Sequence, residues 1–200
     1  KTSGIVGFVR QLVGSRGTYT PDALVDGLAP YADDPDYGIR SDYEGDRSES
    51  EIGSNDLYRV PPEGGEAIRV RDDFEKPNGL AFSPDERILY VSDTGRRNEA
   101  GGPPHIRAFT VNDDLSLSGG DVFAAADPAA SDGFRVDERG NVWTSAGDGV
   151  HCFAPDGRLL GKVLVPERVS NVAFGGPKRN RLFITATTSL YAIYLGIRGV

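Results

Sequence analysis

Three polar residues, Asn78, Asp132 and Asn171, each open a similar stretch of the sequence and carry side-chain oxygens of the kind that bind metal ions. Carboxylate and amide oxygens are the ligands that hard divalent cations such as Ca2+ prefer in proteins. A second interpretation stays open for each residue taken singly. Asn and Asp are also good turn-forming residues, particularly next to glycine.

The three stretches that these residues open share one pattern of strand, turn and strand. Each has a polar residue, a short apolar segment, a charged or glycine-rich turn and a second apolar segment, which predicts two antiparallel strands. The stretches are "NGLAFSPDERILYVSD" from residue 78, "DGFRVDERGNVWTSA" from residue 132 and "NVAFGGPKRNRLFITA" from residue 171. A fourth, degraded copy is expected at residues 26–34, although Pro30 fits poorly inside a strand.

Further strands are predicted between these copies, at residues 56–60, 105–111, 149–154 and 189–195. Four antiparallel strands in a repeating unit of about 40 to 50 residues are typical of a propeller blade. A β-sandwich does not repeat at this period. We therefore predict an all-β fold, a β-propeller with about four blades in this chain.

The innermost strands of a propeller line its central channel, so equivalent positions in successive blades come together. We therefore expect Asn78, Asp132 and Asn171 to converge at one end of that channel. Their common phase favours a metal-binding role for Asn78 and Asp132 over a role in turns alone. For Asn171, metal binding and a place in the pocket wall stay equally open.

Composition limits the classes of partner that the chain is suited to bind. The 200 residues carry a formal net charge of −8, and the isoelectric point is about 4.8. Nucleic acid is therefore not expected as a partner, because a phosphate backbone is bound by a basic surface. The mean hydropathy is −0.36, and no apolar run approaches the roughly 18 residues of a membrane helix, so no membrane association is expected.

The length predicts one domain over residues 1–200, in which two segments stand out. Residues 1–25 form an atypical lead-in, with a weak candidate for a helix at Ile5–Val13, and residues 33–54 form a polar loop, either solvated or a lid beside a site. The first residues have no recognisable signal peptide, and the one cysteine, Cys152, suits a reducing compartment. We expect a cytoplasmic protein, with the periplasm or secretion as the alternative.

The same motifs resemble the gluconolactonase family, which includes senescence marker protein (regucalcin). The resemblance rests on "PNGLAFSPDERILYVSDTG", "DGFRVDERGNVWTSAGDGVHCFAPDGRLLGKV" and "NVAFGGPKRNRLFITATTSLYAI", and it extends over residues 34–195. It implies a six-bladed propeller that hydrolyses sugar lactones with one divalent metal, most often Ca2+, with Zn2+, Mg2+ or Mn2+ as substitutes. It further implies that Asn78 and Asp132 are metal ligands, that the metal polarises the lactone carbonyl, and that Asp132 activates the attacking water.

The sequence also departs from that family, whose members are longer chains. The glutamate ligand of the first blade is not found, and the mid-chain asparagine ligand is missing, with Asp22 as a weak substitute. We therefore expect an incomplete, N-terminally truncated propeller. The alternative function is a noncatalytic fragment or binding module without a complete metal site, and a strictosidine-synthase-like or organophosphate-hydrolysing propeller is a third possibility.

Other residues with reactive side chains are expected to be structural. The two histidines, His105 and His151, show no strand phase that would place a Ser-His-Asp triad in the channel. Trp143 is predicted to pack between blades. Ser92–Gly95 is predicted to form a strand-end turn, although Asp93 facing the channel is a second possibility.

Overall fold

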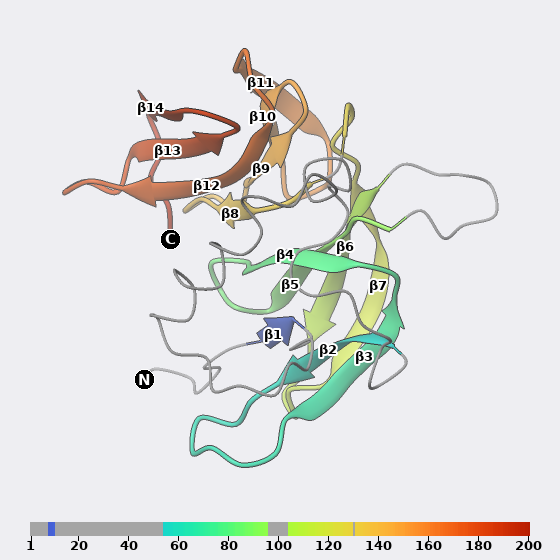
Figure 1. The fold of residues 1–200 in the computed structure, drawn as a ribbon. Coiled ribbons are helices and arrows are strands. Elements are labelled where there is room, and N and C mark those ends of the chain that lie inside the picture. Colours follow the sequence, from blue (N-terminus) through green and yellow to red (C-terminus); the bar gives the residue numbers. More distant parts are fainter. Residues whose placement is uncertain (1–7, 11–53, 96–103, 130) are drawn as a thin grey trace, which may run out of the picture. The chain divides into compact units, whose positions relative to one another are not determined.

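The computed structural model describes residues 8–10, 54–95, 104–129 and 131–200, and all the regular elements among them are β-strands (Figure 1). The strands belong to one compact unit made of residues 1–11 and 55–200. Within the described ranges, no helix is long and apolar enough to cross a membrane. Most of the predicted lead-in and polar loop, and all of the degraded copy at residues 26–34, lie outside the described residues.

The strands form four antiparallel sheets, and within each sheet every strand pairs with the next one along the chain (Figure 1). This confirms the predicted all-β fold with about four blades. The first sheet contains β1 (Phe8–Arg10), β2 (Asn55–Arg59) and β3 (Ile68–Phe74); the second contains β4 (Pro77–Phe82), β5 (Ile88–Asp93), β6 (His105–Val111) and β7 (Leu117–Ala124); the third contains β8 (Phe134–Val136), β9 (Val142–Ala146), β10 (Gly149–Phe153) and β11 (Leu159–Leu164); the fourth contains β12 (Val169–Gly175), β13 (Arg181–Ala186) and β14 (Leu190–Tyr194).

The prediction of a helix at Ile5–Val13 is wrong where the structure describes it. Phe8–Arg10 forms strand β1, which pairs antiparallel with β2. A ladder of hydrogen bonds to a neighbouring strand outweighs a weak local helical pattern, since secondary-structure propensity is easily overridden by tertiary context.

Strands β3, β7 and β11 had no clear signal in the sequence. Most residues of β11 and half of those of β7 are exposed, so these strands lack the alternation of apolar and polar residues that predicts a strand. In β7, Gly119 and Gly120 also have positive φ angles, and the pairing of β6 with β7 is interrupted by register shifts. Such irregularities in β7 disturb the alternation of apolar and polar residues by which a strand is predicted.

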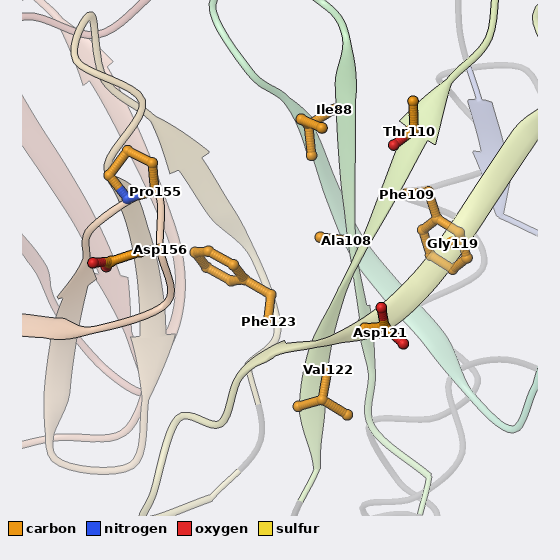
Figure 2. A pocket seen from close by; sticks show the side chains of 10 residues that line it. All are labelled: Ile88, Ala108, Phe109, Thr110, Gly119, Asp121, Val122, Phe123, Pro155 and Asp156. Carbon is orange, nitrogen blue, oxygen red and sulfur yellow. The ribbon is translucent and has the colours of Figure 1, made fainter.

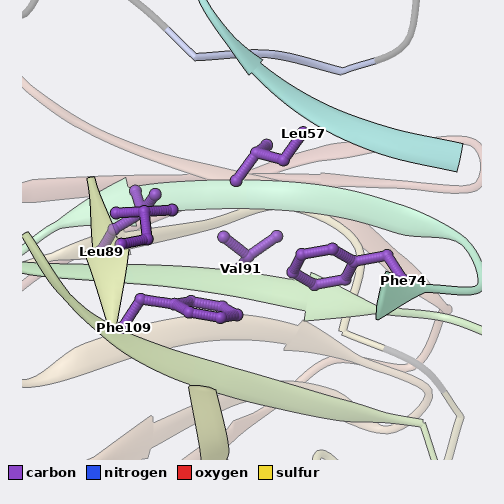
Figure 3. Close-up of a cluster of buried hydrophobic side chains, with 6 residues drawn as sticks. Leu57, Phe74, Leu89, Val91 and Phe109 are labelled. Carbon is purple, nitrogen blue, oxygen red and sulfur yellow. The ribbon is translucent and has the colours of Figure 1, made fainter. Parts of the chain in front are cut away.

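Clusters of buried apolar side chains hold each sheet against the next. Between the first and second sheets, Leu57 and Phe74 pack against Leu89, Val91 and Phe109 (Figure 3). Side chains alternate between the two faces of a strand, so Tyr90, which lies between Leu89 and Val91, points to the opposite cluster. The second sheet therefore contributes one face to each of two cores.

Two further clusters continue this arrangement along the chain. Tyr90 and Ile106 of the second sheet pack with Phe134, Val136 and Val142 of the third. The third and fourth sheets meet in a cluster of Val150, Val165, Val169, Val172, Leu182 and Ile184.

The inner strands of the last three sheets contact one another in order. β4 contacts β8, and β8 contacts β12. These strands carry or directly follow the polar residues that open the three sequence copies. The packing of the sheets therefore brings equivalent repeat positions side by side.

Candidate functional site

Asn78 lies near the start of β4, where the chain enters the strand through a turn that Asp93 holds. The Asp93 carboxylate accepts hydrogen bonds from the backbone N–H groups of Glu75 (3.0 Å) and Lys76 (2.8 Å). Asp93 is buried, with 7% of its surface exposed. Its carboxylate is used by the turn, which confirms the strand-end role predicted for Ser92–Gly95.

Asp132 lies two residues before β8, and its backbone touches β4 at Gly79. A methyl group at Gly79 would collide with the carbonyl oxygen of Asp132 and press on the ring of Phe134. Only glycine allows two backbones to approach so closely. The contact places Asp132 beside the residue that follows Asn78.

The same arrangement recurs one sheet further on, between Gly133 and Asn171. A methyl group at Gly133 would collide with the side-chain amide of Asn171. The Gly133 N–H donates to the carbonyl oxygen of Ser170 (2.9 Å), and the Asn171 Oδ1 atom accepts the N–H of Val172 (2.8 Å). These contacts place Asn171 against the glycine that follows Asp132.

Asn78 and Asn171 thus lie on the inner strands β4 and β12, and Asp132 lies just before the inner strand β8 between them. We call these three residues the polar row. Asn78 and Asp132 are half-buried, whereas Asn171 is exposed. The contacts of Gly79 with Asp132 and of Gly133 with Asn171 support the expectation that the three polar residues lie close together. The assignment of metal-binding and catalytic roles to the row stays a prediction.

Two buried serines beside the row were not singled out from the sequence. The Asp132 N–H donates to Ser145 Oγ (2.9 Å), and Ser92 Oγ lies 3.4 Å from the Asp132 carbonyl oxygen. The sequence does hold a signal for them, because Ser92, Ser145 and Thr185 are all the second-last residue of their copy. All three copies of the repeat therefore have a hydroxyl group at the same position.

The side chains of the polar row fit a hard divalent cation in the type of donor that they offer. Asp132 supplies a carboxylate, and Asn78 and Asn171 supply amide oxygens, whereas Ca2+ takes about six to eight oxygen ligands. Across the described part of the chain, no group of three or more His, Cys, Asp or Glu residues could hold a metal ion. The row therefore provides only part of a coordination shell, and Asp22, the predicted substitute ligand, lies outside the described residues.

A second polar cluster lies at the β9–β10 turn and is satisfied internally. His151, which is 1% exposed, has its Nε2 atom 2.6 Å from Asp148 Oδ1, and Lys162 Nζ donates to Asp148 Oδ2 (2.8 Å). Both partners lower the pKa of Asp148 against the opposing effect of its desolvation. No serine hydroxyl contacts His151 in the hydrogen bonds found among the described residues, which agrees with a structural histidine.

The one tryptophan and the one cysteine of the chain are also structural. The Trp143 ring packs edge-on against Phe174 of the next sheet, with centroids 6.2 Å apart, as predicted, and its Nε1–H donates to Asp137 (2.8 Å). Cys152 is a buried free thiol on β10. Burial, with a smaller contribution from the Asp137 charge, raises the pKa of Cys152 to about 12.

An open pocket of about 320 Å³ lies where strands β6 and β7 face the turn after β10. Figure 2 shows Phe123 of β7 close to Pro155 and Asp156 of that turn. Its lining is mostly apolar, with Asp121 and Asp156 as the only titratable side chains. Because no residue of the polar row lines it, we do not assign it to the candidate site.

Comparison with known proteins identifies the family. Residues 38–188 match the SMP-30/Gluconolactonase/LRE-like region. The chain belongs to this family. Its match to the gluconolactonase of Zymomonas mobilis subsp. mobilis is 32% identical over 175 residues, which is 82% of this chain and 47% of that protein.

Solved structures of the family agree with the fold. A gluconolactonase from Xanthomonas campestris superposes with a TM-score of 0.69 and 37% identity, over 84% of this chain and 52% of that one. Regucalcin from Agrobacterium tumefaciens, a calcium-binding protein, shares the fold with a TM-score of 0.59 and 23% identity, over 73% of this chain and 53% of that one. The chain is thus a β-propeller of the gluconolactonase type that spans about half the length of these relatives.

Proposed function

We propose that this chain contributes the polar row of a sugar lactone hydrolase that depends on a divalent metal. Asp132 is the proposed general base, and Asn78 and Asp132 are the proposed metal ligands. The proposal is supported by membership of the SMP-30/gluconolactonase family and by a relative named as a gluconolactonase. Asn171 is assigned to the wall of the substrate pocket.

The contacts between inner strands carry this proposal. Gly79 lies against Asp132, and Gly133 lies against Asn171, so polar residues far apart in the sequence occupy neighbouring points. A function in turns alone would not require such contacts between different sheets. The half-burial of Asn78 and Asp132 leaves both side chains within reach of a small molecule.

In the proposed reaction, Asp132 accepts a proton from a water molecule whose oxygen attacks the lactone carbonyl carbon. The ring C–O ester bond then breaks, and the ring oxygen takes up a proton as it leaves. The product is an open-chain hydroxy acid, which ionises at neutral pH. Asn171 can orient the sugar hydroxyl groups, because its amide offers both a donor and an acceptor.

A divalent ion bound by Asn78 and Asp132 would supply Lewis-acid polarisation of the lactone carbonyl. The oxygen donors favour Ca2+, with Mg2+, Mn2+ or Zn2+ as substitutes. Because the row provides few ligands, we expect weak binding unless other parts of the protein complete the shell.

The second candidate function is a noncatalytic propeller module. It is favoured by the small number of metal ligands among the described residues. It is also favoured by the extent of the match, which spans only about half the length of the curated relatives. In this case the chain would bind neither a metal nor a lactone.

The two functions are separated by lactone hydrolysis and calcium titration on the same purified chain. Hydrolysis of D-glucono-1,5-lactone is followed by the acid that it releases at constant pH, and Ca2+ binding is followed by calorimetry. We expect Asp132→Asn to lower kcat by about 10²- to 10⁴-fold and to weaken Ca2+ binding. Asp156→Asn, which removes an exposed carboxylate from a turn, is the matched control and should change neither.

A chain that is folded by circular dichroism but neither binds Ca2+ nor hydrolyses the lactone would refute the enzyme proposal. Equal losses in Asp132→Asn and Asp156→Asn would also count against it. Either result favours the noncatalytic module.

A further inference from the structure

We propose that Ser145 and Ser92 are positioning residues that fix the backbone of Asp132 between two sheets. This inference rests on the proposed function, because it assigns a catalytic consequence to the placement of Asp132. Neither serine is suggested to contact the substrate. Each acts through the residue that it holds.

Ser145 holds Asp132 from within the same sheet. Its Oγ atom accepts the Asp132 N–H at 2.9 Å, and its own N–H donates to the carbonyl oxygen of Gly133 at 3.1 Å. Ser145 is completely buried, so water does not compete for its hydroxyl group. One residue therefore fixes two successive backbone groups at the start of β8.

Ser92 holds the same residue from the preceding sheet. Its Oγ lies 3.3 Å from the carbonyl oxygen of Gly79 and 3.4 Å from that of Asp132, so one proton is shared between two acceptors. Both distances are long for O–H···O hydrogen bonds, and we expect Ser92 to contribute less than Ser145. Ser92 is also completely buried.

The third copy of the sequence repeat, in the fourth sheet, shows that the hydroxyl group belongs to the repeat. Thr185 occupies the equivalent position and donates to the carbonyl oxygen of Asn171 at 3.2 Å. Unlike the two serines, Thr185 is exposed. The two buried hydroxyl groups meet at Asp132, the one member of the polar row that can accept a proton as a base.

A carboxylate that transfers a proton must keep one direction relative to the reacting atoms. Misplacement by about 1 Å can cost roughly a hundredfold in rate. The two serines prevent such misplacement by fixing the N–H and the carbonyl oxygen of the same residue.

A purely structural role for Ser145 must be separated from positioning, and the chain offers a matched control. Ser83 is also buried, and its Oγ accepts the backbone N–H of Ile88 at 2.9 Å in the β4–β5 turn. Ser83→Ala and Ser145→Ala therefore both remove a 2.9 Å hydrogen bond from a backbone N–H to a serine hydroxyl. Ser83→Ala also removes the bond that the Ser83 hydroxyl donates to Asp85 (2.6 Å), so it is the more disruptive change to the fold. Only Ser145 touches Asp132.

The test compares kcat, KM and thermal unfolding for the full chain, Ser145→Ala, Ser92→Ala and Ser83→Ala, with D-glucono-1,5-lactone and Ca2+. We expect Ser145→Ala to lower kcat by about ten- to a hundredfold while KM changes less than about twofold. Ser92→Ala should lower kcat by a smaller factor, and it replaces Ser145→Ala if that variant does not fold. Ser83→Ala should lower the melting temperature but leave kcat within about twofold of the parent.

An unchanged kcat in folded Ser145→Ala and Ser92→Ala, or an equal loss in Ser83→Ala, would overturn the proposal. If the parent chain hydrolyses no lactone, the proposed function fails, and hydrogen exchange at the Asp132 amide decides the remaining point. Faster exchange in Ser145→Ala, but not in Ser83→Ala, would show that the serine fixes this backbone. Equal exchange in all variants would reject that as well.

Discussion

Gly79 and Gly133 act at the residue scale as contact points between sheets, and each follows a member of the polar row. At Gly79 the neighbour is the backbone of Asp132, which can yield only if β4 and the start of β8 shift apart. At Gly133 the neighbour is the side chain of Asn171, which can rotate away. The two glycines therefore differ in what a side chain would cost.

We predict that Gly79→Ala destabilises the fold by about 1–3 kcal/mol, because the added methyl group forces β4 and Asp132 apart. It should also lower kcat for the lactone, since Asp132 moves. Urea unfolding and initial rates measure both effects. Gly161→Ala is the control, because a methyl group there meets no atom within 4 Å, and a comparable effect in that variant would contradict the explanation.

The positions of Asn78, Asp132 and Asn171 could be predicted from the sequence because each opens a visible copy of the repeat. The roles of Ser92 and Ser145 could not. Serine near the end of a strand is common, and its burial depends on a neighbouring sheet that local sequence does not describe. Only the comparison of all three copies reveals a hydroxyl at one phase.

At the scale of the elements, Glu167 organises the β13–β14 hairpin from the turn before β12. Its carboxylate accepts hydrogen bonds from the Thr188 N–H, the Ser189 hydroxyl and the Tyr191 hydroxyl, each at 2.7 Å. The bond from Ser189 is the largest of several that lower the pKa of Glu167 to about 2. The ionised carboxylate thus ties three residues of one hairpin to a different turn.

We predict that this hairpin weakens in acid. The pKa of Glu167 is lower in the folded chain than the ordinary value of 4.5, so its stabilisation is complete above about pH 4.5 and is lost as the pH falls towards 2. In that range, Glu167→Gln should show a flatter dependence of unfolding free energy on pH than the parent. Chemical denaturation at a series of pH values measures this.

Glu63→Gln provides the control for the acid effect, because Glu63 is exposed in the β2–β3 turn. The parent and Glu63→Gln should respond to pH alike. A slope in Glu167→Gln equal to that of the parent would contradict the role given to this carboxylate.

The whole molecule is held by the cores between successive sheets, so two leucines on neighbouring strands should differ greatly in importance. Leu182 of β13 is completely buried, whereas Leu190 of β14 is 67% exposed. We predict that Leu182→Ala costs about 2–5 kcal/mol of unfolding free energy. Leu190→Ala should stay within about 0.5 kcal/mol.

The fluorescence of Trp143, the one tryptophan, reports this unfolding directly, because its ring lies between the third and fourth sheets. Equal costs for the two leucine variants would mean that the fourth sheet does not pack on the third as described.

The four-sheet organisation could be predicted from the sequence because the inner strands repeat with clear apolar patterns. The outer strands β7 and β11 could not, since exposure on both faces leaves β11 without a periodic signal. That the chain matches only about half the length of its relatives is known from the comparison with them and not from the sequence itself. No pattern within 200 residues states how many blades a family's full propeller contains.

The buried thiol of Cys152 allows the local opening of the folded chain to be followed by thiol labelling. With a pKa near 12, it contains almost no thiolate at pH 8, and thiolate is the form that reacts with disulfide reagents. Labelling therefore has to wait until β10 separates from its neighbours, and its rate measures how often that happens in native conditions. A cation or a lactone that binds only the folded state lowers the rate of Cys152 labelling. Its binding can therefore be detected without any assay of turnover.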